Sequence, residues 1–430
     1  MISEVIPNIA EKKLTKKEMK LFFISSLGGA LEFYDFVVYI YFSTIISKLF
    51  FDLSSAYTSL LLTYSVFATG YLARIAGGLL FSHYGDLTGR KKSFTFTVFL
   101  MAAPTFIIGL LPTYSQIGIL ATILLFICRF SQGLAIGGEI PCSITFIYEH
   151  ARKSQRGLAI GILFAGIILG IFLGSSAGYI SSKFLSEKEL HSWGWRIPFL
   201  LGGLLGLIGV YLRKYLSETP VFRKMQLENN HIPIKIVIKN HKFNLIQTTS
   251  TIWLIAISVT LYFLYLPNYF VTYYKFNLQD ILKINTFSVL LYSFLIIIFG
   301  IIIDYINPKI ILLISCVLLV LFNIPVFLAF KSSSFISIYI AYLFISFTNS
   351  AATAAGILML ANSFPTSIRY TGSAFAYNLA FGIFGGFTPL ICTTLIESTK
   401  LKYSPAFYIT GVALITLILN SLNSKNSMEI

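Results

Sequence analysis

Charged residues are scarce in this sequence. They make up 11% of its 430 residues, against about 25% in soluble domains. Hydrophobic residues make up 56%, and apolar runs long enough to cross a hydrocarbon core of about 30 Å recur along the whole chain. The scarcity of charge excludes a large soluble domain and predicts an integral membrane protein.

Cysteine and histidine are also rare. The four cysteines all fall inside apolar runs: Cys128, Cys142, Cys316 and Cys392. They have neither the spacing of metal ligands nor facing positions in loops. The five histidines lie at the ends of runs or in loops. We therefore interpret the cysteines as small packing residues and expect no metal site.

Signatures of catalysis and of ATP use are absent too. No loop of the type G-x-x-x-x-G-K occurs, and no nucleophile stands near a base. We expect a protein that is not an enzyme and needs no cofactor. Any energy for its work must then come from a proton or solute gradient.

Twelve apolar runs predict twelve transmembrane helices. The predicted spans are 21–47, 57–83, 93–111, 117–149, 158–182, 197–216, 248–274, 281–303, 310–330, 335–361, 373–396 and 404–421. The longest polar stretch separates spans 6 and 7. The sequence therefore predicts an all-α membrane protein with two six-helix halves, residues 1–216 and 248–430, joined by a linker at 217–247.

Basic residues outnumber acidic ones by 32 to 17. On the predicted topology, 21 of them lie in segments on the side of the N-terminus and 9 in loops on the other side. This asymmetry predicts that both termini are cytoplasmic, in the inner membrane of a bacterium. Anionic lipid headgroups account for the positive charge better than nucleic acid does. The charged first 20 residues lack a cleavage site, so we expect the first helix to be retained.

Two pairs of loops resemble each other. Gly85-Asp86-Leu87-Thr88-Gly89-Arg90-Lys91 after span 2 and the stretch from Asp304 to Lys309 after span 8 both place an acid at a helix end, then a turn, then a base. The loops after spans 4 and 10, the latter with Arg369, form the second pair. The pairs predict two parallel copies with a cavity between them near mid-depth.

We expect these loops to act in gating. Asp86 can accept hydrogen bonds from nearby helix N-terminal amides, at about 0.3 to 1 kcal/mol, and such contacts are easily made and broken. The predicted gating residues are Arg74, Gly85, Asp86, Gly89, Arg90, Lys91, Glu139, Asp304 and Arg369. The alternative is that the loops are solvated turns whose basic residues only set the topology.

Seven motifs, in order along the chain, resemble those of a known family. They are LEFYDF, GYLARIAGG leading to GDLTGRKK, RFSQGLAIGGE, WGWRIPF, SETPVF, LYLPNYF and FPTSIRYTGSAFAYNLA. The chain resembles the major facilitator superfamily and, more narrowly, its metabolite:proton symporters, which include proline/betaine, citrate, shikimate and 2-oxoglutarate transporters. The resemblance implies proton-linked uptake of a small solute by the major facilitator fold.

The chain departs from the family pattern at several positions. Gly29 stands where many relatives carry Asn, Ile75 where Pro is usual, and Asn362 where Glu is frequent. Ser82, Asn307 and Pro308 alter the two copies of the loop signature. These departures concern the gating contacts and the solute rather than the fold.

Three charges lie near mid-depth in the first half. Glu32 and Asp35 are three residues apart and share a face of span 1, while Arg129 lies at the same depth on span 4. Each ionised group costs roughly 3 kcal/mol at the centre of a bilayer, which requires a reason. We predict that Asp35 or Glu32 carries a proton and that Arg129 responds to its loss. The alternative is a cluster that only fixes helix packing.

Polar and aromatic residues suggest where a solute binds. Span 7 places Tyr262, Tyr265 and Tyr269 at positions i, i+3 and i+7, next to a possible helix break at Pro267 and Asn268. Tyrosine faces can hold a quaternary ammonium group, and Arg129 can hold a carboxylate. The further candidates are Asn349 and Asn378. In a chain with 25 Tyr and 40 Phe, these tyrosines could equally be packing residues.

Together these features predict a monomeric secondary symporter that imports a small organic solute with protons by rocking its two halves. The solute is expected to be an osmolyte such as proline or betaine, or an organic acid such as 2-oxoglutarate or citrate. The alternatives are an exporter or proton antiporter on the same fold and, from another class, a non-transporting sensor.

Overall fold

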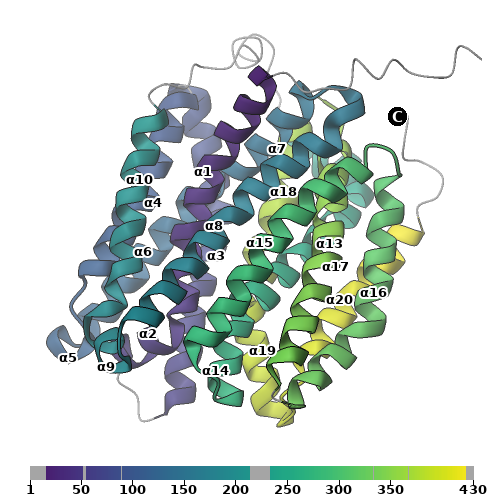
Figure 1. Ribbon diagram of the computed structural model, residues 1–430. Helices are drawn as coiled ribbons and strands as arrows, with labels where there is room; N and C mark the ends of the chain where they lie inside the picture. Colours follow the sequence, from purple (N-terminus) through teal and green to yellow (C-terminus); the bar gives the residue numbers. More distant parts are fainter. Residues whose placement is uncertain are drawn as a thin grey trace, which may run out of the picture.

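The computed structural model describes residues 16–51, 55–88, 90–213, 233–332, 334–366 and 368–422, and every regular element in these ranges is a helix (Figure 1). The helices of the first half are α1 (Lys16–Tyr41), α2 (Ser43–Phe50), α3 (Ala56–Thr88), α4 (Arg90–Leu110), α5 (Tyr114–Ile117), α6 (Ile119–Ile136), α7 (Glu139–His150), α8 (Arg156–Phe184), α9 (Glu187–Glu189) and α10 (Arg196–Arg213). Two short segments, η2 (Lys153–Gln155) and η3 (Leu190–Gly194), precede α8 and α10.

The second half follows the same plan. Its helices are α12 (Pro233–Asn240), α13 (Lys242–Ser258), α14 (Leu266–Tyr274), α15 (Leu278–Ile302), α16 (Pro308–Ala329), α17 (Phe335–Asn362), α18 (Arg369–Leu379), α19 (Gly386–Thr399) and α20 (Pro405–Ser421). Between them lie η4 (Val259–Tyr265), η5 (Phe330–Ser332) and η6 (Ala380–Gly385). The chain is helical from Lys242, before the start of span 7 predicted at residue 248.

The helices match the twelve predicted spans. Among the described residues, eight helical runs are long and apolar enough to cross a membrane, and the bent pair of α1 and α2 makes a ninth. Three shorter apolar helices, Phe96–Leu110, Arg196–Ile208 and Pro405–Ser421, lie where spans 3, 6 and 12 were predicted. Span 4 is divided into α6 and α7 by a short turn at Gly137 and Gly138.

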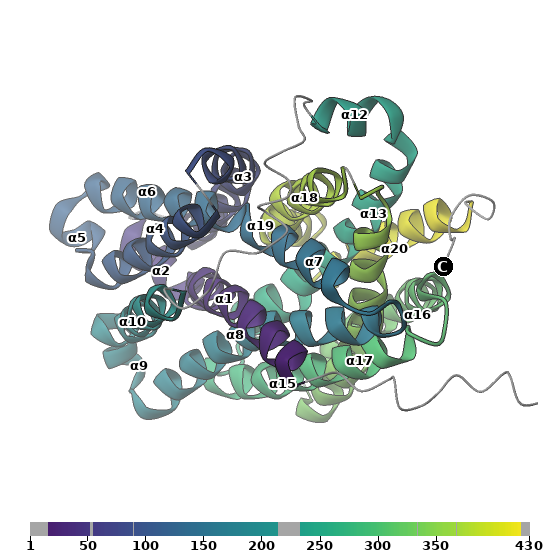
Figure 2. The ribbon, with the colours of Figure 1, turned by 90° about the horizontal axis from the view of Figure 1, so that it is seen from above.

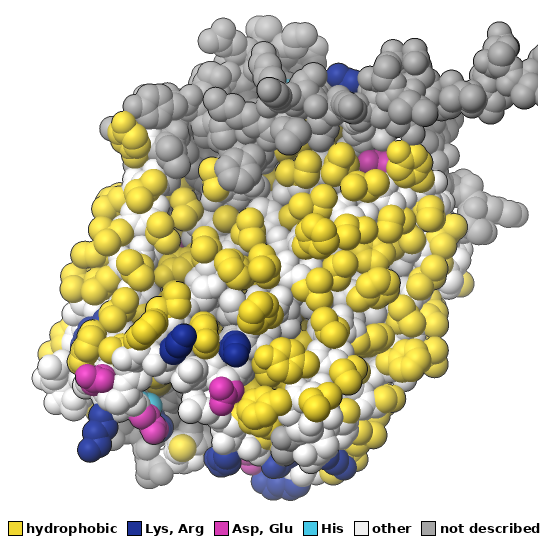
Figure 3. All heavy atoms as spheres, in the orientation of Figure 1, with side chains coloured by type: hydrophobic (Ala, Val, Ile, Leu, Met, Phe, Trp, Pro, Cys, Tyr) yellow, Lys and Arg dark blue, Asp and Glu magenta, His cyan; other side chains and the backbone are white. Residues whose placement is uncertain are grey.

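The two ends of the bundle differ. One end carries α12, the α7–α8 turn and the α15–α16 turn, and we call it the linker end; the other carries α5 and α9, and we call it the loop end (Figures 1 and 2). Figure 3 shows hydrophobic side chains over the middle of the visible face, with charged side chains gathered at the loop end. This is the surface that a bilayer requires.

Glycines set the closest helix contacts. A Cβ atom on Gly77 would clash with the backbone of Leu134, and one on Gly133 with the backbone of Gly70. Helices α3 and α6 therefore touch backbone to backbone, as small residues at a helix contact allow. Gly29 similarly lets α1 approach Ile167 of α8.

Span 7 is not broken at Pro267 and Asn268: Lys242–Tyr274 is one continuous helical run, with a change of helix type just before Pro267. The helix is of the π type over η4 and returns to the α type at Leu266, just before Pro267. Proline has no N–H to donate to the carbonyl of Phe263 four residues earlier. That carbonyl accepts a hydrogen bond from the Tyr41 hydroxyl at 3.1 Å, so this bond joins the second half to α1.

Candidate functional site

Asp35 is buried in the interior of the first half. Its side chain is 2% exposed and points from α1 towards α10, where Gly202 leaves room for one carboxylate oxygen. The side chain of Thr105, on α4, lies beside it. Oδ1 of Asp35 has no hydrogen-bond partner among the described residues. A buried carboxyl of this kind can bind and release a proton.

A chain of hydrogen bonds leads from Thr105 to Arg129. Gln132 donates from Nε2 to the Thr105 hydroxyl at 2.5 Å and accepts at Oε1 from Arg129 Nη1 at 2.8 Å. The Thr105 hydroxyl itself donates to the carbonyl of Met101 at 2.9 Å. The chain of bonds therefore ends at Thr105, whose side chain lies beside the Asp35 carboxyl. No direct salt bridge joins Asp35 and Arg129, both of which are described.

Arg129 is enclosed by aromatic rings. It is fully buried, and its guanidinium carbon lies 4.2 Å from the ring centre of Phe36 and 4.3 Å from that of Tyr39. The Phe67 ring is 5.6 Å away. Phe67 also packs against Tyr71, so that the rings fill the middle of the molecule. These contacts stabilise a cation that lacks water.

Arg74 joins the two halves. Its Nε donates to Oδ1 of Asn378 at 2.9 Å, and Nδ2 of Asn378 donates to the carbonyl of Gly137 at 2.7 Å. The Arg74 guanidinium also lies 5.1 Å from the ring centres of Tyr377 and Phe381. A predicted gating residue and a predicted solute-binding residue thus meet at one contact between α3 and α18.

The three tyrosines of span 7 point to different partners. Tyr262 donates to Asn323 on α16, Tyr265 bonds to Thr393 at 3.1 Å, and Tyr269 donates to the carbonyl of Lys402 at 2.9 Å. Of the three, Tyr265 also packs against the first half, with its ring 5.8 Å from that of Tyr64. The role of all three in solute binding remains a prediction.

Asn349 and Glu139 are both buried. Asn349 donates to the carbonyl of Ile345 on its own helix, α17, at 2.7 Å. Glu139 is the first residue of α7, a position where the positive end of the helix dipole favours an acid. Their predicted roles are not tested by these contacts.

The linker end is closed by contacts between the halves. The carboxylate of Asp304 accepts from the backbone N–H of Gly157 at 2.6 Å and of Leu158 at 3.0 Å, at the start of α8. Arg369 forms a salt bridge with Glu149 at 2.9 Å. Asp304, in the matching loop of the second half, therefore accepts from a helix N-terminus in the way predicted for Asp86.

The loop end is closed as well. Asn268 donates to the carbonyl of Ile40 at 2.6 Å, next to the bond between Tyr41 and Phe263. Asn285 donates to Tyr41 at 3.3 Å and to Ser175 at 3.1 Å. In this structure the two halves are thus held together at both ends.

Several predicted site residues cannot be compared. The side chains of Glu32, Asp86, Arg90 and Lys91, the surroundings of Gly85 and the whole of Gly89 lie outside what the structure describes. The backbone shows that Asp86 belongs to the last turn of α3. In the described part of the chain no group of three His, Cys, Asp or Glu side chains could hold a metal ion.

Sequence reasoning did not identify Thr105 or Tyr148 as site residues. Tyr148 donates to Asn362 at 2.6 Å and accepts from Arg156 at 3.0 Å, which links the halves at the linker end. Both residues have ordinary neighbours in the sequence. Gln132 carried a signal, because it lies one helical turn after Arg129 on an otherwise apolar run.

A family model and several known proteins match most of this chain. The profile described as "Major Facilitator Superfamily" matches residues 25–389. A putative proline/betaine transporter of Staphylococcus aureus (strain MSSA476) is 34% identical over 409 residues, which is 93% of this chain and 87% of that protein. A glycine betaine/proline/ectoine/pipecolic acid transporter, OusA, of Dickeya dadantii (strain 3937) is 31% identical over 407 residues. That match covers 92% of this chain and 81% of OusA.

Solved structures share the fold at lower identity. A partially occluded, inward-open structure of the xylose transporter XylE from E. coli superposes with a TM-score of 0.75 at 16% identity, covering 96% of this chain and 100% of that one. A crystal structure of a D-xylose-proton symporter gives 0.74 at 18%, with 95% and 98% covered. At this level of identity the likeness concerns the arrangement of the helices.

Proposed function

We propose, from the premise that this chain belongs to the major facilitator superfamily, that it imports a zwitterionic osmolyte such as proline or betaine together with protons. The names of the relatives narrow the earlier choice between osmolytes and organic acids. The proposal is carried by the buried position of Asp35 beside Thr105, which is hydrogen-bonded through Gln132 to Arg129.

The hydrogen-bond chain supplies a way to couple the two ligands. The Thr105 hydroxyl has one hydrogen, which it gives to Met101 in the structure. When Asp35 is ionised, that hydrogen is drawn to the carboxylate, and the bonds from Gln132 and Arg129 strengthen because linked hydrogen bonds polarise one another. When Asp35 binds a proton, the chain relaxes and Arg129 becomes free to turn to the carboxylate of a solute.

The aromatic rings suit the other end of a zwitterion. Phe36, Tyr39 and Phe67 lie around Arg129. Tyr71 packs against Phe36 and Phe67, and Tyr265 of the second half packs against Tyr64 of the first. A quaternary or secondary ammonium group can replace the guanidinium over these rings, at up to about 2 kcal/mol when desolvated. The solute would then lie between the halves, where Asn378 and Arg74 also meet.

The cycle follows from the two closed ends. Opening the loop end requires the bonds of Asn268 and Tyr41 to break, and opening the linker end requires those of Asp304 and Arg369 to break. Only one end opens at a time in alternating access. We place the linker end and both termini in the cytoplasm of a bacterium, because the sequence has 21 basic residues in segments on that side and 9 in the loops on the other.

Uptake by proteoliposomes tests the proposal. An acidic exterior should drive accumulation of labelled betaine or proline, and a protonophore should abolish it. Efflux driven by the same gradient would instead favour an exporter or antiporter. Absence of any transport of either solute, in protein shown to be folded, would favour a sensor or a different solute.

A further inference from the structure

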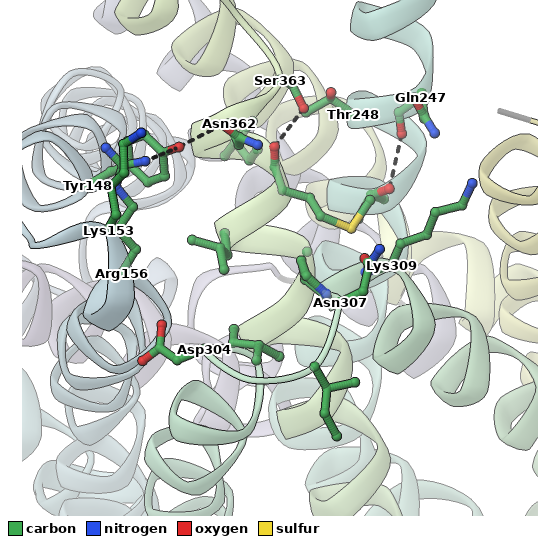
Figure 4. Close-up of a pocket in the computed structure, with 18 of the residues that line it drawn as sticks. Tyr148, Lys153, Arg156, Gln247, Thr248, Asp304, Asn307, Lys309, Asn362 and Ser363 are labelled. Carbon is green, nitrogen blue, oxygen red and sulfur yellow. Dashed lines mark hydrogen bonds between the residues drawn. The ribbon is translucent and has the colours of Figure 1, made fainter. Parts of the chain in front are cut away.

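We propose that a cavity at the linker end, distinct from the central site, binds the phosphate group of an anionic ligand. This linker-end pocket has a volume of about 290 Å³ and lies between the start of α8, the α15–α16 turn and the ends of α13 and α17 (Figure 4). A single water needs about 10 to 15 Å³ of such space. The pocket can therefore hold a phosphate group together with a small molecule that carries it.

The charges of the pocket favour an anion. Lys153, Arg156 and Lys309 line it, and Asp304 is its one acidic lining residue, which leaves a formal excess of two positive charges. Both oxygens of Asp304 already accept from the backbone of α8. Neither Lys153 nor Arg156 forms an ion pair with any described carboxylate, and Nε of Arg156 has no hydrogen-bond partner there.

Neutral donors complete the pocket. Asn362 uses its oxygen to accept from Tyr148, so its amide nitrogen points away from that ring in Figure 4. Thr248 adds a hydroxyl group to the lining, whereas the Thr251 hydroxyl already donates to the carbonyl of Gln247 at 3.1 Å. The N-terminus of α16, a helix of 22 residues, lies at Pro308 and Lys309 on the same wall. The first backbone amides of α16 are already used, because Pro308 has no N–H and the N–H groups of Lys309 and Ile310 donate to Asn307. The helix therefore favours a phosphate group through the positive end of its dipole.

The pocket brings the two halves together. Lys153 and Arg156 belong to the first half, whereas Lys309 and Asn362 belong to the second. An anion held by both sets would stabilise the closed linker end. The pocket has no role in the proposed coupling of proton and solute, so this inference stands without the proposed function.

Asn362 provides the sharpest test. The variant Asn362→Glu places a carboxylate in the lining of the pocket. This carboxylate would lower the net positive charge of the lining and compete with an added anion. Asn362→Gln has the same length but no charge and serves as its matched control. Arg156→Gln removes one of the cations, and Lys402→Gln removes a cation at the loop end, where Lys402 donates to Tyr273.

The measurement is thermal unfolding of the full chain in nanodiscs of neutral lipid, titrated with inorganic phosphate and compared with chloride at equal ionic strength. Phosphate should raise the unfolding temperature of the wild type, Asn362→Gln and Lys402→Gln, since a ligand of the folded state stabilises it. The apparent affinity should fall at least tenfold in Asn362→Glu and Arg156→Gln.

A second arm separates free phosphate from a lipid headgroup. If only nanodiscs that contain phosphatidylglycerol stabilise the protein, and Asn362→Glu abolishes that effect, the headgroup is the source of the phosphate and the site is supported. If neither phosphate nor phosphatidylglycerol stabilises the wild type, or if Asn362→Glu and Arg156→Gln respond like the wild type, the inference is overturned.

Discussion

Arg129 is a cation with no access to water and no carboxylate in direct contact among the described side chains. Burying such a charge costs several kcal/mol even when hydrogen bonds remain. The rings of Phe36 and Tyr39 and the oxygen of Gln132 offset part of that cost. Arg129 is hydrogen-bonded through Gln132 to Thr105, which lies beside Asp35. Because burial of Arg129 costs free energy, the proposed coupling of proton and solute explains this residue better than a contribution to stability does.

The first prediction concerns Asp35. Asp35→Asn keeps the shape of the side chain but cannot exchange a proton, so betaine accumulation driven by an acidic exterior should fall at least tenfold. Exchange of internal for external betaine needs no net proton movement and should continue. Both are measured in proteoliposomes with labelled betaine. Accumulation that stays concentrative and pH-dependent in this variant would contradict the role of Asp35.

The second prediction concerns Thr105, the link between Asp35 and Gln132. Thr105→Val has nearly the same volume but no hydroxyl, so it should leave solute exchange intact while lowering the accumulation ratio and flattening its dependence on external pH. Thr105→Ser retains the hydroxyl and should restore both. The two variants are compared over an external pH range of about 5 to 8, where physiological pH responses lie. Equal accumulation and pH profiles for both would show that Thr105 only packs.

The sequence was sufficient to find Asp35 and Arg129, because charges in long apolar runs are conspicuous. It was not sufficient to find their connection. Thr105 is a neutral residue in span 3 and resembles the many Thr side chains that simply bond to their own helix, as Thr105 also does with Met101. Only the packing of α4 between α1 and α6 brings it to Asp35 and Gln132.

At the scale of the elements, the contact between α3 and α6 positions both buried arginines. Gly77 and Gly133 let the two backbones touch, and Arg74 and Arg129 lie on these same helices. Since van der Waals packing drives helix association within lipid, small residues at the contact contribute directly to stability.

The third prediction tests that contact. Gly77→Leu would force the side chain against the backbone of Leu134, which cannot move out of the way, and should destabilise the protein by about 3 kcal/mol or more. Gly411→Ala is the control, since nothing lies within 4 Å of its added Cβ. Thermal unfolding in detergent measures both. A Gly77→Leu variant as stable as the control would contradict the close contact.

Span 7 shows which features of a helix the sequence predicts. An irregularity near Pro267 is predictable, because proline removes a backbone donor. The π-helical form of η4 and η6 was not predictable, since it depends on which neighbours satisfy the displaced carbonyls. For Phe263 that neighbour is Tyr41, more than two hundred residues away in the sequence.

At the scale of the whole molecule, the two halves contact each other at both ends and around Arg74. Twelve spans and their division into halves followed from hydropathy, which lipid makes a strict requirement. The sequence predicts a cavity near mid-depth, whereas the linker-end pocket lies at one end of the bundle. Its position depends on how the halves meet, and aromatic side chains such as Phe36 and Tyr71 occupy the middle instead.

The fourth prediction concerns closure of the linker end. Asp304→Asn removes the charge from two hydrogen bonds to the start of α8, at about 1.5 to 3 kcal/mol. The population with an open linker end should therefore rise at least tenfold. Spin labels at Ser154 and Tyr305, both exposed, in a chain whose four cysteines are replaced, report the distance between the halves.

The matched control for that experiment is Glu397→Gln. It removes the salt bridge to Lys400, 3.1 Å long and located at the loop end, and should leave the distance distribution at the linker end unchanged. Identical distributions for Asp304→Asn and the wild type would show that Asp304 does not hold the gate.

The most direct test of the account is to measure proton and solute movement in the same vesicles. Proteoliposomes that contain a pH-sensitive dye, with equal pH on both sides and the membrane potential clamped by potassium and valinomycin, receive external betaine, or proline in a parallel run. The account predicts internal acidification that accompanies solute uptake in the wild type and is absent in Asp35→Asn. Uptake of either solute by the wild type without any internal acidification would contradict it.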